Sequence, residues 1–438
     1  MTNNKSKKIP QPSMSFETTN VHSKNKTVNV LSLFSGCGGM DLGFEGRFSV
    51  YKKSVSSNSD FIERPIDEHF VLLKDTVFKT VFANDILKEA FVAWSHHFRK
   101  YGYSPDTYRQ ESIVDLVKMH RQGFKVFPDN VEIVTGGFPC QDFSVAGKRK
   151  GFNSHKDHNG DLINGTIVNE ETRGKLYSWM KEVIDITKPK IFIAENVKGL
   201  VNLSDVKDII QKDFSTADGD GYLVLPPQVL HAANYGVPQS RERVIFIGIK
   251  KSALKESAYN ALTSDSIPDE YNPYPKPTHA HTFVDISLEP SVNLKDVFAM
   301  LAEPDKSKDP SQRIYSKAKY MGAHCQGQKE INLNSIGPTI RSEHHGNIEY
   351  RRLSKEHGGE HFEELGKGLT ERRLTPRECA IIQTFPMDYE FVIPSPNRKN
   401  SFTLSSSAAY KVIGNAVPPL LAYHIAKRIE SLWNIYFE

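Results

Sequence analysis

The chain has 438 residues, which is enough for two domains, since single cores rarely grow beyond about 250–300 residues. Lys and Arg number 56 against 52 Asp and Glu, and this formal net charge of +4 permits nucleic-acid binding without indicating it. Four widely separated cysteines and the lack of a membrane-length apolar run argue against a disulfide framework, a bound metal and a membrane span, so a cytoplasmic protein is expected.

A glycine-rich turn follows the first apolar run of the chain. Residues 1–27 are rich in Asn, Ser, Thr and Lys without apolar periodicity, which predicts a mobile tail. Residues 28–34 then form a strand-like run that ends in Ser-Gly-Cys-Gly-Gly and continues as a helix-like segment. Small residues at such a turn let a nucleotide-type ligand touch backbone N–H groups. Because Gly36-x-Gly38-Gly39 is not a full G-x-G-x-x-G, a tight turn without a ligand is an equally good interpretation on this pattern alone.

An acidic residue follows the next strand-like run. Residues 79–83 end at Asn84-Asp85, where a carboxylate can bond the two hydroxyls of a ribose. Asp85 can also cap the helix-like segment 86–98. The gap between the glycine turn and Asp85 is wider than the roughly 20 residues usual for such a unit, so residues 47–76 are interpreted as an inserted surface excursion.

Alternation of β and α segments continues through the first half of the chain. Buried-type strands that alternate with helices predict an α/β fold with a doubly wound, mostly parallel sheet. The further segments lie at residues 112–114, 131–134, 176–187, 190–194 and 244–249.

Cys140 stands at a turn suited to chemistry. The run 131–134 leads into Gly-Gly-Phe-Pro-Cys, which places the thiol beyond a strand end, where ligands of open α/β sheets collect. Most free cysteines are buried small hydrophobes. Here Pro139 fixes φ and the two glycines allow close approach of a ligand, so we favour a thiol that is held rigidly and stays accessible.

The character of the sequence changes after Lys250. Proline and histidine become frequent and no sustained helical period appears until Pro376, which predicts a second, smaller domain of short strands and loops. Thr375 can cap the helix that begins at Pro376, and residues 420–437 show helical spacing and should pack back on the sheet. The expected division is a catalytic domain at 28–255 and 411–438, with the second domain and its hinge at 256–410.

Five segments in a specific order closely resemble the DNA (cytosine-5) methyltransferases, especially the bacterial enzymes of restriction-modification systems. They are the turn 34–39, Pro139-Cys140, Glu195-Asn196-Val197, the Gln-x-Arg-x-Arg segment 239–243 and Gly414-Asn415-Ala416-Val417. The resemblance runs from residue 28 to the C-terminus. It implies a methyltransferase-type sheet domain, S-adenosylmethionine as cofactor, and a target-recognition domain between the Gln-x-Arg-x-Arg segment and the helix at Pro376.

The resemblance also implies a reaction and its partners. The substrate would be a specific cytosine in double-stranded DNA, rotated out of the duplex and methylated at C5, and the chain would act as a monomer. A genetically linked restriction endonuclease would be the enzyme against which host DNA is protected.

Catalytic roles follow for four residues. Cys140 would be the nucleophile that adds at C6, because cytosine C5 is a poor nucleophile until a thiolate adds there. Glu195 would contact N3 as an acid, in a pocket that could raise its pKa. Arg241 and Arg243 alternate on an extended segment and should point the same way, one to phosphate and one to the cytosine O2.

Cofactor contacts are implied at a larger set of positions. Asp85 would bond the ribose, Ile86 would lie against the adenine, and Ser112 with Ile113 stands where family members often carry an acidic residue, so the adenine amine contact departs from the pattern. The remaining positions are Phe34, Gly36, Gly38, Gly39, Pro139, Leu176, Asn415 and Val417.

DNA contacts are expected at two places. Gln141 and Ser144 would hold DNA beside the cysteine, and the basic run 148–150 is either a phosphate strip or a solvated loop. In the second domain Arg341 is a candidate for a base or a phosphate contact at even odds. The other candidates are Gln239, Thr339 and Ile340. Histidines 344 and 345 lack further ligands at a standard zinc spacing.

Three other functions fit parts of the pattern. A tRNA methyltransferase would keep the fold, but the long variable segment argues against it. A DNA-binding protein without catalysis does not explain the set Cys140, Glu195 and Arg243. A nicotinamide-dependent dehydrogenase uses the same kind of sheet.

Overall fold

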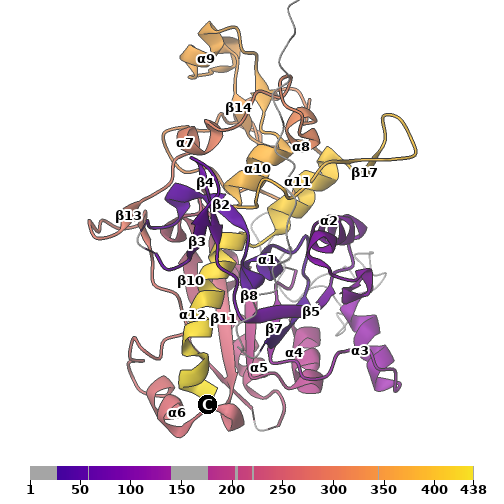
Figure 1. Cartoon of the computed structure of the whole chain (residues 1–438), viewed down its shortest axis with the longest axis vertical. Coiled ribbons are helices and arrows are strands. Elements are labelled where there is room, and N and C mark those ends of the chain that lie inside the picture. The colour runs from indigo at the N-terminus through magenta and orange to yellow at the C-terminus, as the bar shows by residue number, and fades with distance from the viewer. Residues whose placement is uncertain are drawn as a thin grey trace, which may run out of the picture.

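An eight-stranded mixed sheet forms the centre of the molecule (Figure 1). The computed structural model describes residues 27–57, 59–139, 176–202, 206–219, 221–343 and 345–437. Seven strands follow one another in the sheet order β10 (Gln228–His231), β11 (Glu242–Lys250), β8 (Ile191–Val197), β7 (Ile133–Gly136), β1 (Val28–Leu33), β5 (Phe78–Asn84) and β6 (Tyr108–Arg109), and β9 (Tyr222–Val224) pairs with β11.

The strands from β6 to β8 are parallel, whereas β9 and β10 run antiparallel to β11, and β11 runs antiparallel to β8. This arrangement confirms the predicted doubly wound, mostly parallel α/β fold. The chain leaves β1 to form β5 on one side and later returns to form β7 on the other, so β1 is the switch point of the sheet. Ligands of open α/β sheets bind beyond the carboxyl ends of the strands at such a point.

Helices cover both faces of the sheet and create two apolar cores. Alternate side chains of a strand point to opposite faces, so Ile133 and Val134 belong to different cores. One core contains α1 (Gly39–Glu45), α2 (Lys88–Phe98) and α12 (Pro419–Phe437), and the other contains α3 (Ile113–Arg121), α4 (Leu176–Thr187) and α5 (Val206–Ser215). Residues 112–114 begin α3, although the sequence pattern placed them among the β/α alternation without assigning them to a helix.

The segment 47–76 is a folded sheet and not a surface excursion. Its antiparallel strands are β2 (Ser49–Tyr51), β3 (Ile62–Pro65) and β4 (Phe70–Leu73), in the order β2-β4-β3. Leu73 is fully buried, and the ring of Phe61 packs edge-on against Tyr423 of α12 at 5.3 Å between centroids. The width of the gap between the glycine turn and Asp85 had suggested a surface excursion, but apolar side chains of this segment bury the insertion against α12.

Short elements dominate from residue 256 onward, as predicted. Those between residues 294 and 415 gather at the top of the view in Figure 1, beyond the sheet, whereas α6 lies at the opposite end near the C-terminus. They are α6 (Glu256–Leu262), β12 (His279–Ala280), β13 (Glu289–Pro290), α7 (Leu294–Phe298), α8 (Pro310–Arg313), β14 (Tyr350–Arg352), α9 (Phe362–Gly366), β15 (Arg372–Arg373), α10 (Pro376–Ile382), β16 (Ile393–Pro394), β17 (Phe402–Leu404) and α11 (Ser406–Asn415).

Short 3₁₀ segments occur along the described chain, mostly before residue 256. They are Lys52–Ser54, Arg99–Tyr101, Pro105–Thr107, Lys198–Asn202, Ala232–Tyr235, Lys251–Ala253 and Lys355–His357.

Residues 255–278 pack with the sheet domain. The Lys255 N–H donates to the Tyr436 carbonyl, and the Tyr274 hydroxyl donates to the Ile245 carbonyl.

Helix signals in the second half were read correctly from the sequence. The Thr375 side chain accepts from the Glu378 N–H, the Glu378 side chain accepts in return, and Pro376 opens α10. This reciprocal capping satisfies two N–H groups that the first turn of a helix leaves without partners. In the part of the chain that the structure describes, no helix combines the length and the apolar character needed to cross a membrane.

Candidate active site

Glu195 is a buried carboxyl group near the carboxyl end of β8. It lies opposite Ile245 of β11, and its Oε1 atom is 2.7 Å from Nε of Arg243. Only 8% of Glu195 is exposed, and this burial raises its pKa, although Arg243 and Arg241 act to lower it. The result is an acid that tends to keep its proton and that a neighbouring guanidinium holds in place.

The chain that leads to Pro139 passes directly beside Glu195. A Cβ atom added at Gly137 would lie 2.9 Å from Oε2 of Glu195, so a side chain there would displace the carboxyl group. The Asn196 side-chain amide also donates to the Phe138 carbonyl at 3.1 Å. Cys140, Gln141, Ser144 and the basic run 148–150 lie outside the described residues. Gly137 and Phe138, which lie three and two residues before Cys140 in the sequence, contact Glu195 and its neighbour Asn196.

The glycine turn lies at the end of β1, at the same edge of the sheet. The Gly38 N–H donates to the Ser35 carbonyl at 2.9 Å and closes a four-residue turn, in which Gly36 has φ +55°. A Cβ at Gly36 would meet no atom within 4 Å, whereas one at Gly39 would lie 2.2 Å from the Val417 carbonyl oxygen. Gly36 therefore borders open space, and Gly39 allows the end of the chain to pack against the turn. Phe34, with φ +53°, precedes it.

Asp85 connects the glycine turn to α2. Its Oδ2 accepts from the Gly36 N–H at 3.1 Å and its Oδ1 from the Leu87 N–H at 2.9 Å. Burial raises the pKa of this carboxyl group. The helix begins at Lys88 with Leu87 as its N-cap, so Asp85 supports the start of α2 from two residues before the cap. Beside it Ile86 keeps 38% of its surface exposed, which suits a contact with a flat apolar ligand.

Three other predicted cofactor positions are buried in the core. Ser112 caps α3, since its side chain accepts from the Val114 N–H, and Ile113 is 3% exposed. Leu176 is 5% exposed and belongs to the same core. The structure gives Ser112 a helix-capping role, and its contact with a cofactor stays a prediction. Contacts of the other two with a cofactor stay a prediction.

Arg241 does not have the position expected for a nucleotide contact. It is 1% exposed, and its guanidinium donates to the carbonyls of Ile340, Gly414 and Ala416 at 2.8–3.0 Å. These carbonyls come from the second region and from the end of α11. The prediction that Arg241 grips the flipped nucleotide together with Arg243 is therefore wrong, because its donors already tie three segments of the chain together.

Gln239 and Ile340 are also structural and not available to DNA. Both are completely buried; Gln239 accepts from the Ile340 N–H at 3.0 Å and donates to the Gln383 side chain at 2.9 Å. Arg341 donates to the Asn347 carbonyl at 2.8 Å and to Oε1 of Glu349 at 3.0 Å, so its guanidinium is held within the protein.

The sequence pattern indicated polar and basic side chains at these positions, but their tertiary partners could not be read from it. Thr339 remains exposed and donates to the Ser240 carbonyl.

The end of the chain returns to the glycine turn. Asn415 is exposed at the C-terminus of α11, and Val417 is buried, with its carbonyl against Gly39. Val417 therefore lies at the turn, and a role of either residue in cofactor binding stays a prediction.

Several residues at the turn were assigned no role from the sequence. Asp41 is 1% exposed and accepts from Ser32 at 2.5 Å and from the Trp94 indole at 2.7 Å. Burial raises its pKa to about 7, although these two hydrogen bonds act against the shift. Tyr108 and Tyr389 donate to carbonyls of the turn. Only the position of Asp41, two residues after Gly39, could have indicated its involvement.

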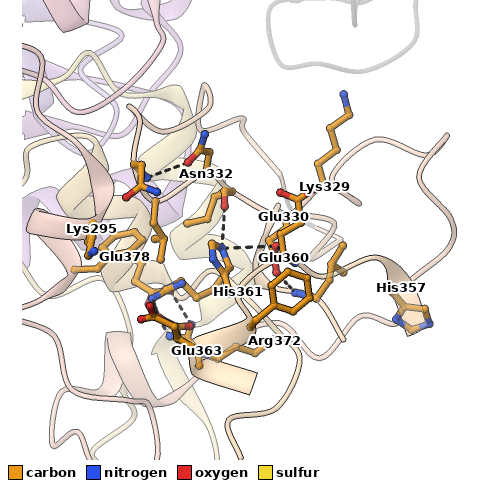
Figure 2. A pocket seen from close by; sticks show the side chains of 18 of the residues that line it. Lys295, Lys329, Glu330, Asn332, His357, Glu360, His361, Glu363, Arg372 and Glu378 are labelled. Carbon is orange, nitrogen blue, oxygen red and sulfur yellow. Dashed lines mark hydrogen bonds and ion pairs between the residues drawn. The ribbon is translucent and has the colours of Figure 1, made fainter. Parts of the chain in front are cut away.

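A separate hollow of about 1020 Å³ lies between α7, α9 and β14 (Figure 2). Its polar lining is mostly neutralised internally: Arg372 pairs with Glu378 at 2.8 Å, and His361 donates towards the Ile331 carbonyl at 3.0 Å. None of the residues predicted for catalysis or cofactor binding is among the described residues that line it. No group of three or more His, Cys, Asp or Glu suited to a metal ion occurs in the described ranges.

Fold and site together define an α/β enzyme with a nucleotide-type turn and an acid–arginine pair at one edge of the sheet. The model of the family C-5 cytosine-specific DNA methylase matches residues 28–431. Type II methyltransferase M.BsuRI of Bacillus subtilis is 31% identical over 422 residues, covering 94% of this chain and 80% of the relative. Type II methyltransferase M.BspRI of Lysinibacillus sphaericus is 32% identical over 419 residues, covering 93% and 82%.

Solved structures show the same fold. The S. pombe Dnmt2 methyltransferase superposes with a TM-score of 0.52 at 16% identity, covering 93% of this chain and 99% of that one. The Entamoeba histolytica methyltransferase EhMeth gives 0.51 at 15% identity, covering 94% and 99%.

The chain therefore belongs to the C-5 cytosine-specific DNA methylase family. It is a DNA (cytosine-5) methyltransferase of the bacterial restriction-modification type, and its reaction requires a methyl donor.

Proposed function

We propose that the chain methylates C5 of one specific cytosine in duplex DNA through a transient bond between Cys140 and C6 of a flipped base. The methyl donor is S-adenosylmethionine, and the modification protects host DNA from a cognate restriction endonuclease. The observation that carries this proposal is the buried Glu195–Arg243 pair, which lies against the segment that leads into Cys140.

The thiol at position 140 activates the base. Its thiolate adds to C6, and the electron pair of the C5–C6 double bond becomes available at C5. After C5 has gained the methyl group, a base removes the C5 proton, the double bond re-forms and the thiolate leaves. This sequence splits one difficult substitution into two easier steps.

Glu195 and Arg243 stabilise the charge that this addition creates. A protonated Glu195 donates to N3 as negative charge builds up on the ring, which is why its raised pKa is useful. Arg243 is the partner that fixes the carboxyl group, at 2.7 Å, and its remaining N–H groups suit the cytosine O2. A proton on Glu195 and a charge on Arg243 together favour the adduct over the free base.

The described residues at the turn fit S-adenosylmethionine, which supplies a methyl group on a positively charged sulfur when bound. Gly36 borders open space, so a ligand can approach the backbone there. Asp85, with oxygens already oriented by two backbone N–H groups, would bond the ribose hydroxyls, and the exposed Ile86 would lie against the adenine. Phe34 precedes the same turn and Asn415 lies two residues before Val417, which packs against it, so both would complete the site.

The position of the acid supports the proposed flipping of the base. Glu195 is 8% exposed, so a cytosine that remained stacked in a duplex could not bring N3 to it. Sequence choice is assigned to the region 256–410, because base reading needs side chains in a groove while the sheet stays fixed around the chemistry. We infer that one copy of the chain acts on each site.

Methyl transfer to defined nucleic acids tests the proposal. Labelled methyl groups from S-adenosylmethionine should enter duplex DNA and not tRNA, and bisulfite sequencing of DNA from an expressing host should show one protected cytosine in a fixed sequence context. Incorporation into tRNA alone, or methylation without sequence preference, would contradict the proposed substrate.

A further inference from the structure

Two tyrosine hydroxyls hold successive carbonyl groups of the glycine turn. The Tyr108 hydroxyl, from β6, donates to the Gly36 carbonyl at 3.1 Å, and the Tyr389 hydroxyl donates to the Cys37 carbonyl at 2.5 Å. Both side chains are buried, at 3% and 0% exposure. Two buried hydroxyl donors from distant parts of the chain therefore hold the backbone of the turn in place.

The peptide between Cys37 and Gly38 is fixed on both of its sides. Its carbonyl accepts from Tyr389, while its N–H, which points the opposite way in a trans peptide, donates to the Ser35 carbonyl at 2.9 Å. The Cys37 thiol in addition donates to the Val412 carbonyl of α11 at 3.3 Å. Rotation of this peptide would break two hydrogen bonds at once, so the shape of the turn depends on the phenol below it.

A column of stacked rings holds Tyr389 in place. Its ring lies between that of His97 of α2, at 4.0 Å between centroids, and that of Phe391, at 4.6 Å, and both are tilted by only 16°. Phe385 packs edge-on against it at 5.0 Å. Packing alone therefore fixes the ring, and the hydroxyl can be removed without removing the ring contacts.

The segment that carries Tyr389 begins at the end of α10. Gln383, at the C-cap of that helix, bonds Gln239 and donates to the Ile413 carbonyl at 2.7 Å. Tyr389 thus reaches the glycine turn from a segment that is itself bonded to the start of β11 and to α11. Tyr108 reaches it from the opposite edge of the sheet, beyond β5.

We propose that Tyr108 and Tyr389 are positioning residues for S-adenosylmethionine, because their hydroxyls hold the Gly36 and Cys37 carbonyls in the turn that receives the cofactor. This inference rests on the proposed use of S-adenosylmethionine. Neither hydroxyl touches the reacting atoms; each acts through the backbone of the turn.

Removal of the hydroxyl alone tests this role. In Tyr389→Phe the ring column stays intact, and the Kd for S-adenosylmethionine, measured by calorimetry on the full chain, should rise about fivefold to tenfold, the effect of one lost hydrogen bond. The Kd for duplex DNA should stay within a factor of about two. The KM for S-adenosylmethionine should rise while kcat at saturating cofactor is kept. Tyr108→Phe should act in the same direction.

Tyr410→Phe is the matched control. That tyrosine is also buried, at 1% exposure, but its hydroxyl donates to the Leu374 carbonyl at 2.7 Å, away from the turn. Its cofactor Kd should stay that of the wild type, and thermal unfolding without ligands compares the three variants for stability.

Several outcomes would overturn the inference. The first is that the wild type binds S-adenosylmethionine and that Tyr108→Phe or Tyr389→Phe, correctly folded, binds it with the same Kd. Another is an equal loss of affinity in Tyr410→Phe. Failure of the wild type to bind S-adenosylmethionine would instead overturn the proposed cofactor. If one of the two variants does not fold, the other decides.

Discussion

At the scale of single residues, the site depends on a carboxyl group that is buried, bonded to an arginine and still inclined to keep its proton. Desolvation disfavours the charged form of Glu195, and Arg243 favours it; the net shift of the pKa is upward from 4.5. In the proposed mechanism the protonated form of Glu195 donates to the base, so activity should be highest at pH values below this raised pKa.

Glu195→Gln keeps the shape and the contact with Arg243 but removes the acid. We expect kcat to fall by about 10²–10⁴-fold, the contribution of a positioned acid, while the Kd for S-adenosylmethionine is unchanged. In the wild type kcat/KM should decrease as the pH rises through the raised pKa, and this decrease should be missing from the residual activity of the variant. Glu242→Gln is the control, because Glu242 is partly exposed on β11 and pairs with Lys198 at 2.7 Å. Equal losses in both variants would remove the special role of Glu195.

Asp85→Ala tests the cofactor turn. Loss of the carboxylate should weaken binding of S-adenosylmethionine by about 1.5–3 kcal/mol, the range for hydrogen bonds to a charged group. Asp115→Ala, which removes an exposed carboxylate from the first turn of α3, should leave the affinity unchanged. If calorimetry gives Asp85→Ala the affinity of the wild type, Asp85 does not bind the cofactor, and its role is limited to the hydrogen bonds with Gly36 and Leu87.

The placement of several predicted site residues at strand ends was readable from the sequence, but the partners of several polar neighbours were not. Glu195, Asp85 and Gly36 stand in local patterns whose position at strand ends is set by the fold. Arg241 and Gln239 look like DNA-contacting side chains, yet their donors are taken by the Ile340 carbonyl and the Gln383 side chain, about 100 residues or more along the chain. Such partners exist only after folding, so no local pattern could reveal them.

At the scale of elements, the glycine turn is shaped by the close approach of α1 to the segment that follows α11. Gly39 has an ordinary φ, but a side chain there would collide with the Val417 carbonyl. Gly36 has open space for a side chain, but its φ of +55° disfavours any residue other than glycine. The alternation of strands and helices was predictable because apolar periodicity follows the sheet. The three-stranded insertion was not, because a polar run at 54–60 masked the apolar strands around it.

Substitution of each glycine by alanine separates the effect of crowding at position 39 from the effect of the positive φ at position 36. Gly39→Ala forces a Cβ to 2.2 Å from the Val417 carbonyl and should lower the free energy of unfolding by about 1–3 kcal/mol, as overpacking does. Gly36→Ala should cost about 1–2 kcal/mol through its backbone conformation, and its methyl group should also weaken cofactor binding because it fills open space. Chemical denaturation and calorimetry on both variants measure this. Gly39→Ala with wild-type stability would contradict the close packing described for the turn.

At the scale of the whole molecule, the two regions are joined by Arg241. Its guanidinium bonds the second region through Ile340 and the end of α11 through Gly414 and Ala416, from the start of the strand that carries Arg243. A buried cation bonded to three carbonyls fixes the second region against the sheet edge that carries Glu195 and Arg243.

Arg241→Met should therefore act on stability. We expect the free energy of unfolding to fall by about 2–4 kcal/mol, because the three carbonyls lose charged donors. The slope of log Kd for DNA against log salt should stay that of the wild type, since no phosphate contact is lost. The exposed Arg398→Met serves as a control for stability. If Arg241→Met kept normal stability but reduced the salt slope of DNA binding by about one, Arg241 would have to contact a DNA phosphate after all.

The most direct test of the mechanism uses a duplex in which fluorine replaces the hydrogen at C5 of the target cytosine. Release from the enzyme requires removal of that hydrogen, so wild-type protein should remain joined to this DNA through Cys140, in a product that needs S-adenosylmethionine and survives denaturation. Cys140→Ser should bind the duplex but give no such product, because a hydroxyl is a far weaker nucleophile than a thiol. Serine at Cys37, Cys325 or Cys379 should leave trapping intact; Cys37 and Cys379 are buried, and burial raises their pKa. An adduct mapped to one of these three, or full activity in Cys140→Ser, would contradict the account.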